Sequence, residues 1–224
     1  MPIQLAVFDM AGTTVADHGD VITFFQKAFK KNGVIVKSGD LQPVRGLKKM
    51  DAVHRVLDAV NVEAGASLVE KIHEDFINEL TAYYRTSPVV KPAPGAEEIF
   101  LWLKQKGIRV TLNTGFPRPV ADLIINRFHW HQNGLTDEYI TSDDVEQGRP
   151  YPFMIRELMK NAGVRKADEV VKIGDTPVDI QEGRNAGCGL VIGITTGASS
   201  RDKLEEWHPD HIIDHLTELK TLIK

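Results

Sequence analysis

The residues of this chain best placed to do chemistry are carboxylates that end predicted strands. Asp9 ends the apolar run of "LAVFDMAGTT", Asp143 and Asp144 end a later strand, and Asp175 ends another. In a parallel sheet the carboxyl ends of the strands form one edge, where ligands bind. A single aspartate there is more often a helix N-cap, but several carboxylates at one edge repel each other unless a cation lies among them. The pattern therefore predicts a cation site.

Five short apolar segments can supply the strands that position these acids. Helical patterns separate the later segments, and Gly107, Gly163 and Gly187 stand where helices should end. Strands that alternate with helices of this length indicate a doubly wound, Rossmann-like parallel sheet of the α/β class. The predicted strands are 3–9, 109–115, 137–144, 169–175 and 189–197, and the predicted helices are 94–107, 117–128, 151–163 and 178–187.

One interval breaks the alternation. Between Ala16 and Ser87 no strand pattern appears, whereas 21–33, 47–60 and 68–85 have the apolar spacing of helices. The prolines of "SPVVKPAPG" then mark a linker back to the alternating pattern. We expect a catalytic core formed by 1–15 and 88–224, with a helical cap domain, 16–87, inserted after the first strand.

Composition narrows the class of protein. The chain has 224 residues, a net charge of -4 and a pI near 6.1, which argues against nucleic acid as the main partner. Cys188 is the only cysteine, which fits a reducing compartment. The N-terminus has no signal-peptide pattern, and no apolar run reaches the roughly 20 residues that span a bilayer. We expect a soluble, cytoplasmic protein that does not bind membranes.

Three stretches carry a family resemblance: "FDMAGTT", "GRPYP" and "GDTPVDIQEGRNAG". They resemble the haloacid dehalogenase superfamily and, within it, phosphonoacetaldehyde hydrolases (phosphonatases) and the phosphonatase-like hydrolases. The resemblance implies that Asp9 is a nucleophile that attacks phosphorus. It also implies a Mg²⁺ ion held by Asp9, the backbone carbonyl of Ala11 and Asp175, with Asp179 supporting these ligands from behind without binding the ion itself.

The resemblance also suggests which residues meet the phosphoryl group. Arg149 stands where most superfamily members have lysine, and its planar guanidinium suits oxyanions. Gly12 and Thr13, with Thr14, would offer backbone amides and hydroxyls. At the end of the second strand the family expects Ser or Thr; the alignment places Asn113 there and Thr114 next, and the choice between them stays open.

Ala11 is the departure that points to a particular reaction. In the phosphatases of this superfamily a second aspartate at this position protonates the leaving alkoxide, which Ala11 cannot do. Phosphonatases instead form a Schiff base between a cap lysine and the substrate aldehyde, so that the leaving group becomes an enamine. Residues 46–51 match the Gly-Leu-x-Lys-x-Asp stretch of phosphonatases, which makes Lys49 the candidate amine. The alternative is that Lys48 and Lys49 are ordinary solvent-exposed charges at the start of a cap helix.

Two further departures concern the substrate. Phosphonatases generally have Met where this chain has Arg45, and His where it has Ala52. The loss of the histidine removes a proton-transfer group for Schiff-base formation, and Arg45 adds a cation able to bind a carboxylate. These departures favour a phosphonatase-like enzyme and leave open whether its substrate is phosphonoacetaldehyde itself.

Three hypotheses about function follow. The first is Mg²⁺-dependent cleavage of the carbon–phosphorus bond of a small 2-oxo-alkyl phosphonate through an aspartyl-phosphate and a Lys49 Schiff base. The second is hydrolysis of a phosphomonoester of a small metabolite, with Lys49 only binding substrate. The third is a metal- or ligand-binding relative that has lost catalysis; the retention of Asp9, Arg149, Asp175 and Asp179 argues against it. Related phosphonatases pair through their caps, which makes a homodimer through the cap an expectation here.

Overall fold

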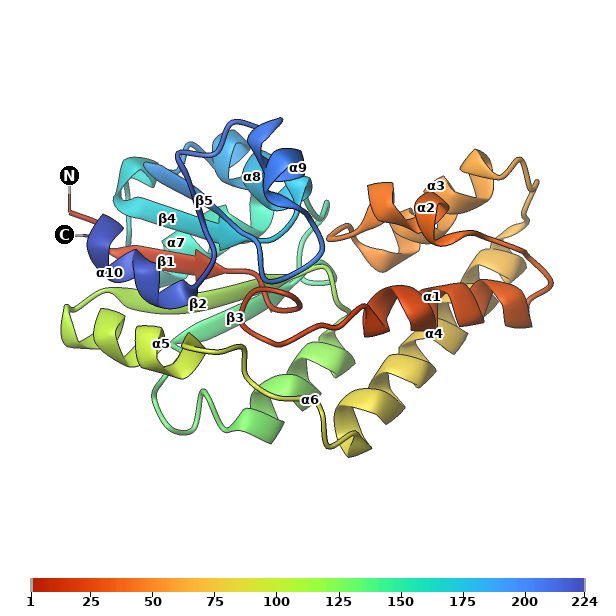
Figure 1. The fold of residues 1–224 in the computed structure, drawn as a ribbon, viewed down its shortest axis with the longest axis horizontal. Coiled ribbons are helices and arrows are strands. Elements are labelled where there is room, and N and C mark those ends of the chain that lie inside the picture. Colours follow the sequence, from red (N-terminus) through yellow and green to blue (C-terminus); the bar gives the residue numbers. More distant parts are fainter. Residues whose placement is uncertain (1, 224) are drawn as a thin grey trace.

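The sheet of the computed structural model, which describes residues 2–223, has six parallel strands in the order β3-β2-β1-β4-β5-β6 (Figure 1). This confirms the predicted α/β class. All five predicted strands form; the sixth, β6, is only three residues long and was not predicted. The strands are β1 Leu5–Phe8, β2 Arg109–Thr114, β3 Glu138–Thr141, β4 Val170–Gly174, β5 Leu190–Ile194 and β6 His211–Ile213.

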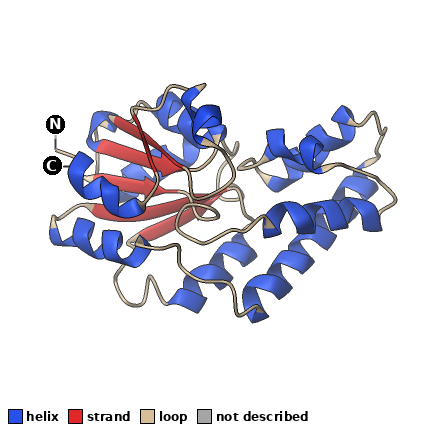
Figure 2. Ribbon diagram, in the orientation of Figure 1, coloured by secondary structure: helices blue, strands red, loops and turns tan. Residues whose placement is uncertain are grey.

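Helices account for most of the remaining chain (Figure 2). The helices from residue 96 onward are α5 Ala96–Gln105, α6 Arg118–Phe128, α7 Phe153–Ala162, α8 Pro177–Ala186, α9 Arg201–Glu205 and α10 Leu219–Leu222. Those between β1 and α5 are α1 Asp20–Lys31, α2 Ser38–Leu41, α3 Lys49–Ala59 and α4 Ala66–Thr86. Among the helices of residues 2–223, none combines the length and the apolar composition that crossing a bilayer requires.

Both faces of the sheet are buried, which explains why its strands are continuously apolar rather than alternating. Ala6 and Phe8 of β1 pack in one apolar cluster with α5 and α6. Leu5 and Val7 point to the other face and pack with α7 and α8. The core is therefore a three-layer arrangement with β1 at its centre.

The helices α1 to α4, which we call the cap, lie beyond the carboxyl ends of the strands (Figure 1). Aromatic side chains hold them together; the ring of Phe25 lies 5.1 Å from that of Phe29 and 4.7 Å from that of Phe76, measured between centroids. Division of the chain into domains at 16 and 87, and pairing of two copies through the cap, stay predictions.

The strand order reverses at β1, which has β2 on one side and β4 on the other. Such a switch point leaves a crevice at the carboxyl ends of the two diverging strands. Asp9 follows β1 directly and Asp175 follows β4 directly, so the topology brings these two acids to the same crevice, beneath the cap.

Candidate active site

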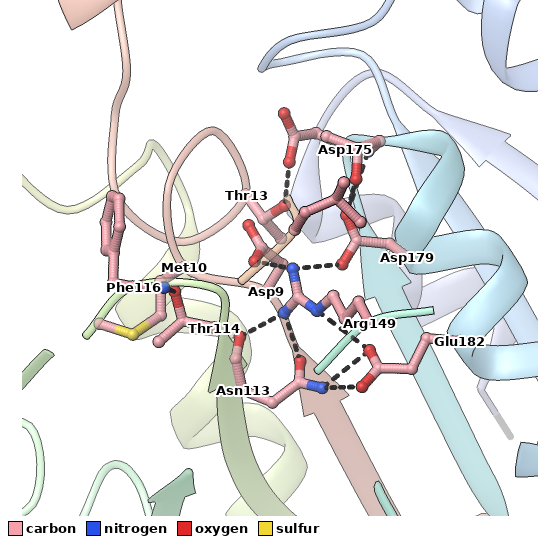
Figure 3. A network of polar contacts seen from close by, with 12 residues as sticks. Asp9, Met10, Thr13, Asn113, Thr114, Phe116, Arg149, Asp175, Asp179 and Glu182 are labelled. Atoms are coloured by element: carbon pink, nitrogen blue, oxygen red, sulfur yellow. Dashed lines mark hydrogen bonds and ion pairs between the residues drawn. The ribbon is translucent and has the colours of Figure 1, made fainter. Parts of the chain in front are cut away.

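Three buried carboxylates meet at the switch point (Figure 3). Asp9 comes from the end of β1, Asp175 from the end of β4, and Asp179 from the first turn of α8. One carboxylate oxygen of each lies within 4.8 Å of the other two. Asp179 is fixed by the start of its own helix, since its Oδ2 accepts hydrogen bonds from the amide (3.2 Å) and the hydroxyl of Thr176.

Arg149 ties this cluster to the end of β2. Its Nη1 lies 2.6 Å from Oδ1 of Asp9 and 2.9 Å from Oδ1 of Asp179, and its Nε lies 3.1 Å from Oε2 of Glu182. Its Nη2 donates to the backbone carbonyl (2.6 Å) and the side-chain carbonyl (2.8 Å) of Asn113. Its side chain has no exposed surface, so Arg149 is part of the buried site and not a surface arginine in a turn.

Sequence reasoning missed two members of this network, Lys172 and Glu182. Lys172 lies in the middle of β4, and its Nζ is 2.9 Å from Asp179 Oδ1, 3.3 Å from Glu182 Oε2 and 2.7 Å from Asn113 Oδ1. A signal existed for both. A lysine inside the apolar strand "EVVKIGD" needs a buried partner, and Glu182 follows Asp179 by three residues on the same face of α8.

The formal charges of this network do not cancel. Four buried carboxylates face two buried cations, which leaves an excess of two negative charges. The acids are Asp9, Asp175, Asp179 and Glu182, and the cations are Arg149 and Lys172. A divalent cation would balance this excess, and carboxylate and carbonyl oxygens are the ligands that Mg²⁺ prefers.

Asp175 shows where such an ion fits. Within residues 2–223 it has no ion pair, and its oxygens accept only from the amide of Ala198 (2.6 Å) and the hydroxyl of Thr13 (3.3 Å). Burial, followed by the charges of Asp9 and Asp179, raises the pKa of Asp175 well above its usual range. A bound cation would reverse this effect.

The other predicted contacts of the ion are also consistent with the geometry. Ala11 lines the cavity between Asp9 and the cap, and no donor to its carbonyl is found in the described part of the chain. Both oxygens of Asp179 are already bound, by Arg149 and Thr176 among others, which suits a supporting residue. Gly12 leaves room for the cluster: with a φ of 88°, a Cβ there would lie 2.5 Å from Asp175 Oδ2.

Some of the residues expected to bind phosphate have hydrogen-bond donors that are already used within the protein, and others have donors that are free; Gly12, Thr13 and Asn113 belong to the first group. The amides of Gly12 and Thr13 donate within their own loop, to Val15 (2.8 Å) and Met10 (3.2 Å). The side chain of Asn113 is fully buried, with its amide group bound to Glu182.

Thr114, in contrast, lines the cavity. Its Oγ1 accepts a hydrogen bond from the amide of Phe116 at 3.0 Å, so its hydroxyl proton can still be donated to a ligand. The amides of Met10 and Ala11 have no acceptor among residues 2–223. In this structure Thr114 and these two amides, rather than Gly12, Thr13 and Asn113, have donors left for a phosphoryl group.

A small hollow of about 50 Å³ lies between Asp9 and the cap; we call it the catalytic cavity, after the role predicted for Asp9. Lys49, the first residue of α3, lines it and is only 6% exposed. Its Nζ donates to the carbonyl of Leu47 (3.1 Å) and lies 5.7 Å from the centre of the Phe116 ring. No carboxylate pairs with it in the described chain. Burial first, and then the charge of Arg149, lowers the pKa of Lys49 to about 8.

Close packing of the cap on the core fixes Lys49 above Asp9. The loop before α3 lies directly on the end of β2, where a Cβ at position 115 would be 2.5 Å from the carbonyl oxygen of Gly46 and 2.6 Å from that of Leu47. Only glycine fits at Gly115. The backbone contact therefore holds the start of α3 against the core.

Arg45 also lines the catalytic cavity, paired with Asp17, a residue that sequence reasoning missed. Nη2 of Arg45 is 3.1 Å from Oδ2 of Asp17, whose Oδ1 accepts the amides of Gly19 and Asp20 at 3.0 Å each. Asp17 thus binds two amides at the start of α1 and, on its other oxygen, Arg45, which precedes the loop that leads to α3. Arg45 lines the cavity with one of its nitrogens already paired with Asp17, and its role in binding substrate stays a prediction.

Asp143 and Asp144 do not join the carboxylate cluster, contrary to the expectation from their position after β3. Asp144 pairs with the guanidinium of Arg118 and accepts the amide of Thr141 at 2.7 Å, and Asp143 accepts the amide of Arg118 at 3.1 Å. Asp144 is thus neutralised by Arg118, and Asp143 binds the first amide of α6, so both acids have local structural roles.

Comparisons with known proteins point to one family. The family model that matches residues 3–187 is that of haloacid dehalogenase-like hydrolases. Among curated relatives, phosphonoacetaldehyde hydrolases of two Bacillus cereus strains are 30% and 32% identical over 224 and 222 residues. These alignments cover 93% and 92% of this chain and 83% and 81% of the relatives.

Solved structures share the fold at lower identity. A phosphonoacetaldehyde hydrolase-like protein from Oleispira antarctica has a TM-score of 0.88 at 20% identity, with 100% of this chain and 92% of that one covered. A predicted phosphoglycolate phosphatase from Haemophilus somnus has a TM-score of 0.82 at 19% identity, with 99% and 98% covered.

Proposed function

Since this chain belongs to the haloacid dehalogenase-like hydrolases, we propose that it cleaves the carbon–phosphorus bond of a small 2-oxo-alkyl phosphonate. The observation that carries the proposal is the position of Lys49, buried, without a carboxylate partner, and lining the same cavity as Asp9. The relatives named phosphonoacetaldehyde hydrolase support it.

Lys49 acts first. A neutral amine is needed to add to the substrate carbonyl, and the pKa of about 8 leaves roughly one lysine in ten neutral near pH 7. Nζ forms a bond to the carbonyl carbon, and loss of water gives a protonated imine. This iminium group withdraws electrons from the neighbouring carbon–phosphorus bond.

Asp9 then attacks phosphorus. Arg149 binds Oδ1 of Asp9 at 2.6 Å, which orients the carboxylate and leaves Oδ2 as the nucleophile. As the new oxygen–phosphorus bond forms, the carbon–phosphorus bond breaks and its electron pair moves into an enamine on Lys49. The hydroxyl of Thr114 would hold a phosphoryl oxygen. A Mg²⁺ ion held by Asp9, the Ala11 carbonyl and Asp175, with Asp179 supporting them, would screen the phosphoryl charge.

Two hydrolyses complete the cycle. Water attacks the aspartyl-phosphate and releases inorganic phosphate, which restores the Asp9 carboxylate. The enamine takes up a proton on carbon to return to the iminium, and water then releases the carbonyl product and the Lys49 amine. No step requires an acid at position 11, which is consistent with Ala11.

Phosphomonoester hydrolysis, the alternative, requires a proton for the leaving oxygen. Besides the two acids assigned to the metal, Asp17 is the one carboxylate that lines the catalytic cavity within residues 2–223. Its two oxygens are bound by the start of α1 and by Arg45. Among the described residues that line the cavity, no carboxylic acid is therefore free to protonate the leaving oxygen, and we favour the phosphonate reaction.

Reductive trapping tests the proposal. Borohydride added during turnover of phosphonoacetaldehyde should convert the imine to a stable secondary amine, stop activity, and add mass to the peptide that contains Lys49. Lys48→Arg, a change at the half-buried neighbour, should still be trapped, whereas Lys49→Arg should not. Labelling of a different lysine, or no labelling while the substrate is consumed, would refute the Schiff base.

A further inference from the structure

A second, larger hollow adjoins the catalytic cavity between the cap and helices α8 and α9. Its volume is about 820 Å³, against about 50 Å³ for the catalytic cavity. We call it the cationic cleft; its lining includes Arg45, Arg55, Gln181, Ser199, Lys203 and Trp207. Arg45 and Ala198 line both hollows, so the two meet at these residues.

The charge of this cleft is opposite to that of the chain. Acidic residues outnumber basic ones, 31 to 27, yet the cleft is lined by three cations and by no carboxylate. Arg55 has no ion pair within residues 2–223, and Arg45 uses only Nη2 for Asp17. Lys203 pairs with Glu206 on the exposed surface, where such a pair contributes little. Several N–H donors are therefore available to an anion.

The position of the cleft relates it to the substrate. Arg45 precedes the loop that leads to Lys49, and the amide of Ala198 binds Asp175, a neighbour of Asp9 in the carboxylate cluster. The boundary between the hollows therefore runs close to the proposed amine and to the cluster that contains the proposed nucleophile. The catalytic cavity is much the smaller of the two hollows, and the two meet at Arg45 and Ala198. A longer substituent on the carbonyl carbon that points toward Arg45 would enter the cleft.

We propose that the cationic cleft binds a second anionic group of the substrate, a carboxylate at the end remote from phosphorus. This rests on the proposed function, because it takes phosphorus to lie at Asp9 and the carbonyl at Lys49. The planar guanidinium groups of Arg45 and Arg55 match the two oxygens of a carboxylate. Trp207, 39% exposed, offers an apolar surface to the connecting methylene groups.

Unreactive ligands test the cleft without requiring catalysis. Calorimetry in the presence of Mg²⁺ would compare alkylphosphonates with ω-carboxyalkylphosphonates of equal length, over a series of increasing lengths. Beyond the length that passes Arg45, the terminal carboxylate should tighten binding by roughly tenfold or more. The double variant Arg55→Gln with Lys203→Gln should lose this gain and bind alkylphosphonates as the parent does.

A control variant and a free anion make the test specific. Arg201→Gln, which lies on the same helix as Lys203 but pairs with Asp214 outside the cleft, should keep the full gain. Equal affinities for the two series, or a gain that survives in the double variant, would overturn the proposal. Free butyrate that binds as favourably as the tethered carboxylate would also overturn it, since the cleft would then be an anion site independent of the substrate.

The same ligands separate this inference from the reaction at Lys49. If borohydride traps nothing while the carboxylate gain persists and depends on Arg55 and Lys203, the Schiff base fails and the second anionic group stands. If trapping succeeds and the carboxylate brings no gain, the proposed function stands and the cleft has no role in substrate binding.

Discussion

Replacement of Lys49 by methionine should stabilise the folded protein near neutral pH while it abolishes phosphonate cleavage. The pKa of Lys49 falls from 10.5 to about 8 on folding, chiefly because of burial. That difference corresponds to a cost of about 3 kcal/mol for holding the charged ammonium in the cavity. Methionine has a similar length and no charge. The carbonyl of Leu47 would lose its hydrogen bond from Nζ, at about 1 kcal/mol, which leaves a net gain of about 2 kcal/mol.

The pH dependence gives this prediction its sign. Between about pH 8 and 10.5 the unfolded chain holds a proton on Lys49 that the folded chain has released, so Lys49 makes the free energy of unfolding rise with pH across this window. Below the window its full cost is present. Above it the cost is gone and only the hydrogen bond to Leu47 remains. The stabilisation by Lys49→Met should therefore disappear, and reverse by about 1 kcal/mol, as the pH approaches 10.5.

Urea unfolding followed by circular dichroism, near pH 7 and at about pH 10, measures the free energies of unfolding of the parent and of Lys49→Met. Lys48→Met is the matched control, since it removes a charge from the half-buried neighbour and should show no comparable change between the two pH values. If Lys49→Met lowers the free energy of unfolding equally at both pH values, burial of the charged Lys49 does not destabilise the protein. The argument for a neutral amine at this position would then be wrong.

Four other changes test the site. Lys49→Arg keeps the charge but cannot form an imine; phosphonate cleavage should fall by several orders of magnitude while hydrolysis of a reactive aryl phosphate changes far less, and equal losses on both would refute its role. Asp9→Ala should lower activity by roughly a thousandfold or more, while its circular dichroism matches that of the parent. Activity within about tenfold of the parent would exclude Asp9 as the nucleophile. EDTA should abolish turnover and Mg²⁺ restore it, so full activity after exhaustive chelation would count against the metal site. Arg149→Met leaves Asp9 without an ion pair among the described residues and leaves Asp179 and Glu182 with Lys172 alone, so it should lower the free energy of unfolding by about 3–5 kcal/mol in urea; a loss below about 1 kcal/mol would show that these carboxylates are satisfied without Arg149.

The sheet and its two leading acids could be predicted because both depend on local pattern. Asp9 and Asp175 each follow a continuous apolar strand, and parallel topology brings strand ends together whatever the detailed packing. The strand β6 was missed because three residues are too short to show a period. Asp143 and Asp144 follow a strand in the same way, but the fold supplies Arg118 beside them, and no local pattern indicates such a partner.

The remaining parts of the site depend on register and on tertiary contacts. Asn113 and Thr114 are adjacent in β2, so their side chains point to opposite sides of the sheet, and the sequence does not say which side meets the ligand. Arg45 and Asp17 are paired only because the loop before α3 folds back onto the start of α1. The lysine inside the apolar strand indicates that Lys172 needs a buried partner, but only the packing of α8 against β4 shows that Asp179 and Glu182 supply it.

The contact between Gly115 and the loop before α3 has a consequence for the speed of the enzyme. With the carbonyl oxygens of Gly46 and Leu47 where a Cβ would stand, not even a water layer separates the two surfaces, and the reacting groups beneath are almost closed to solvent. If substrate enters by a lid opening that breaks and remakes this contact, the motion is of the kind that takes microseconds to milliseconds in other enzymes. The frequency of that opening then sets an upper limit on the turnover number, however fast the bonds to phosphorus are exchanged.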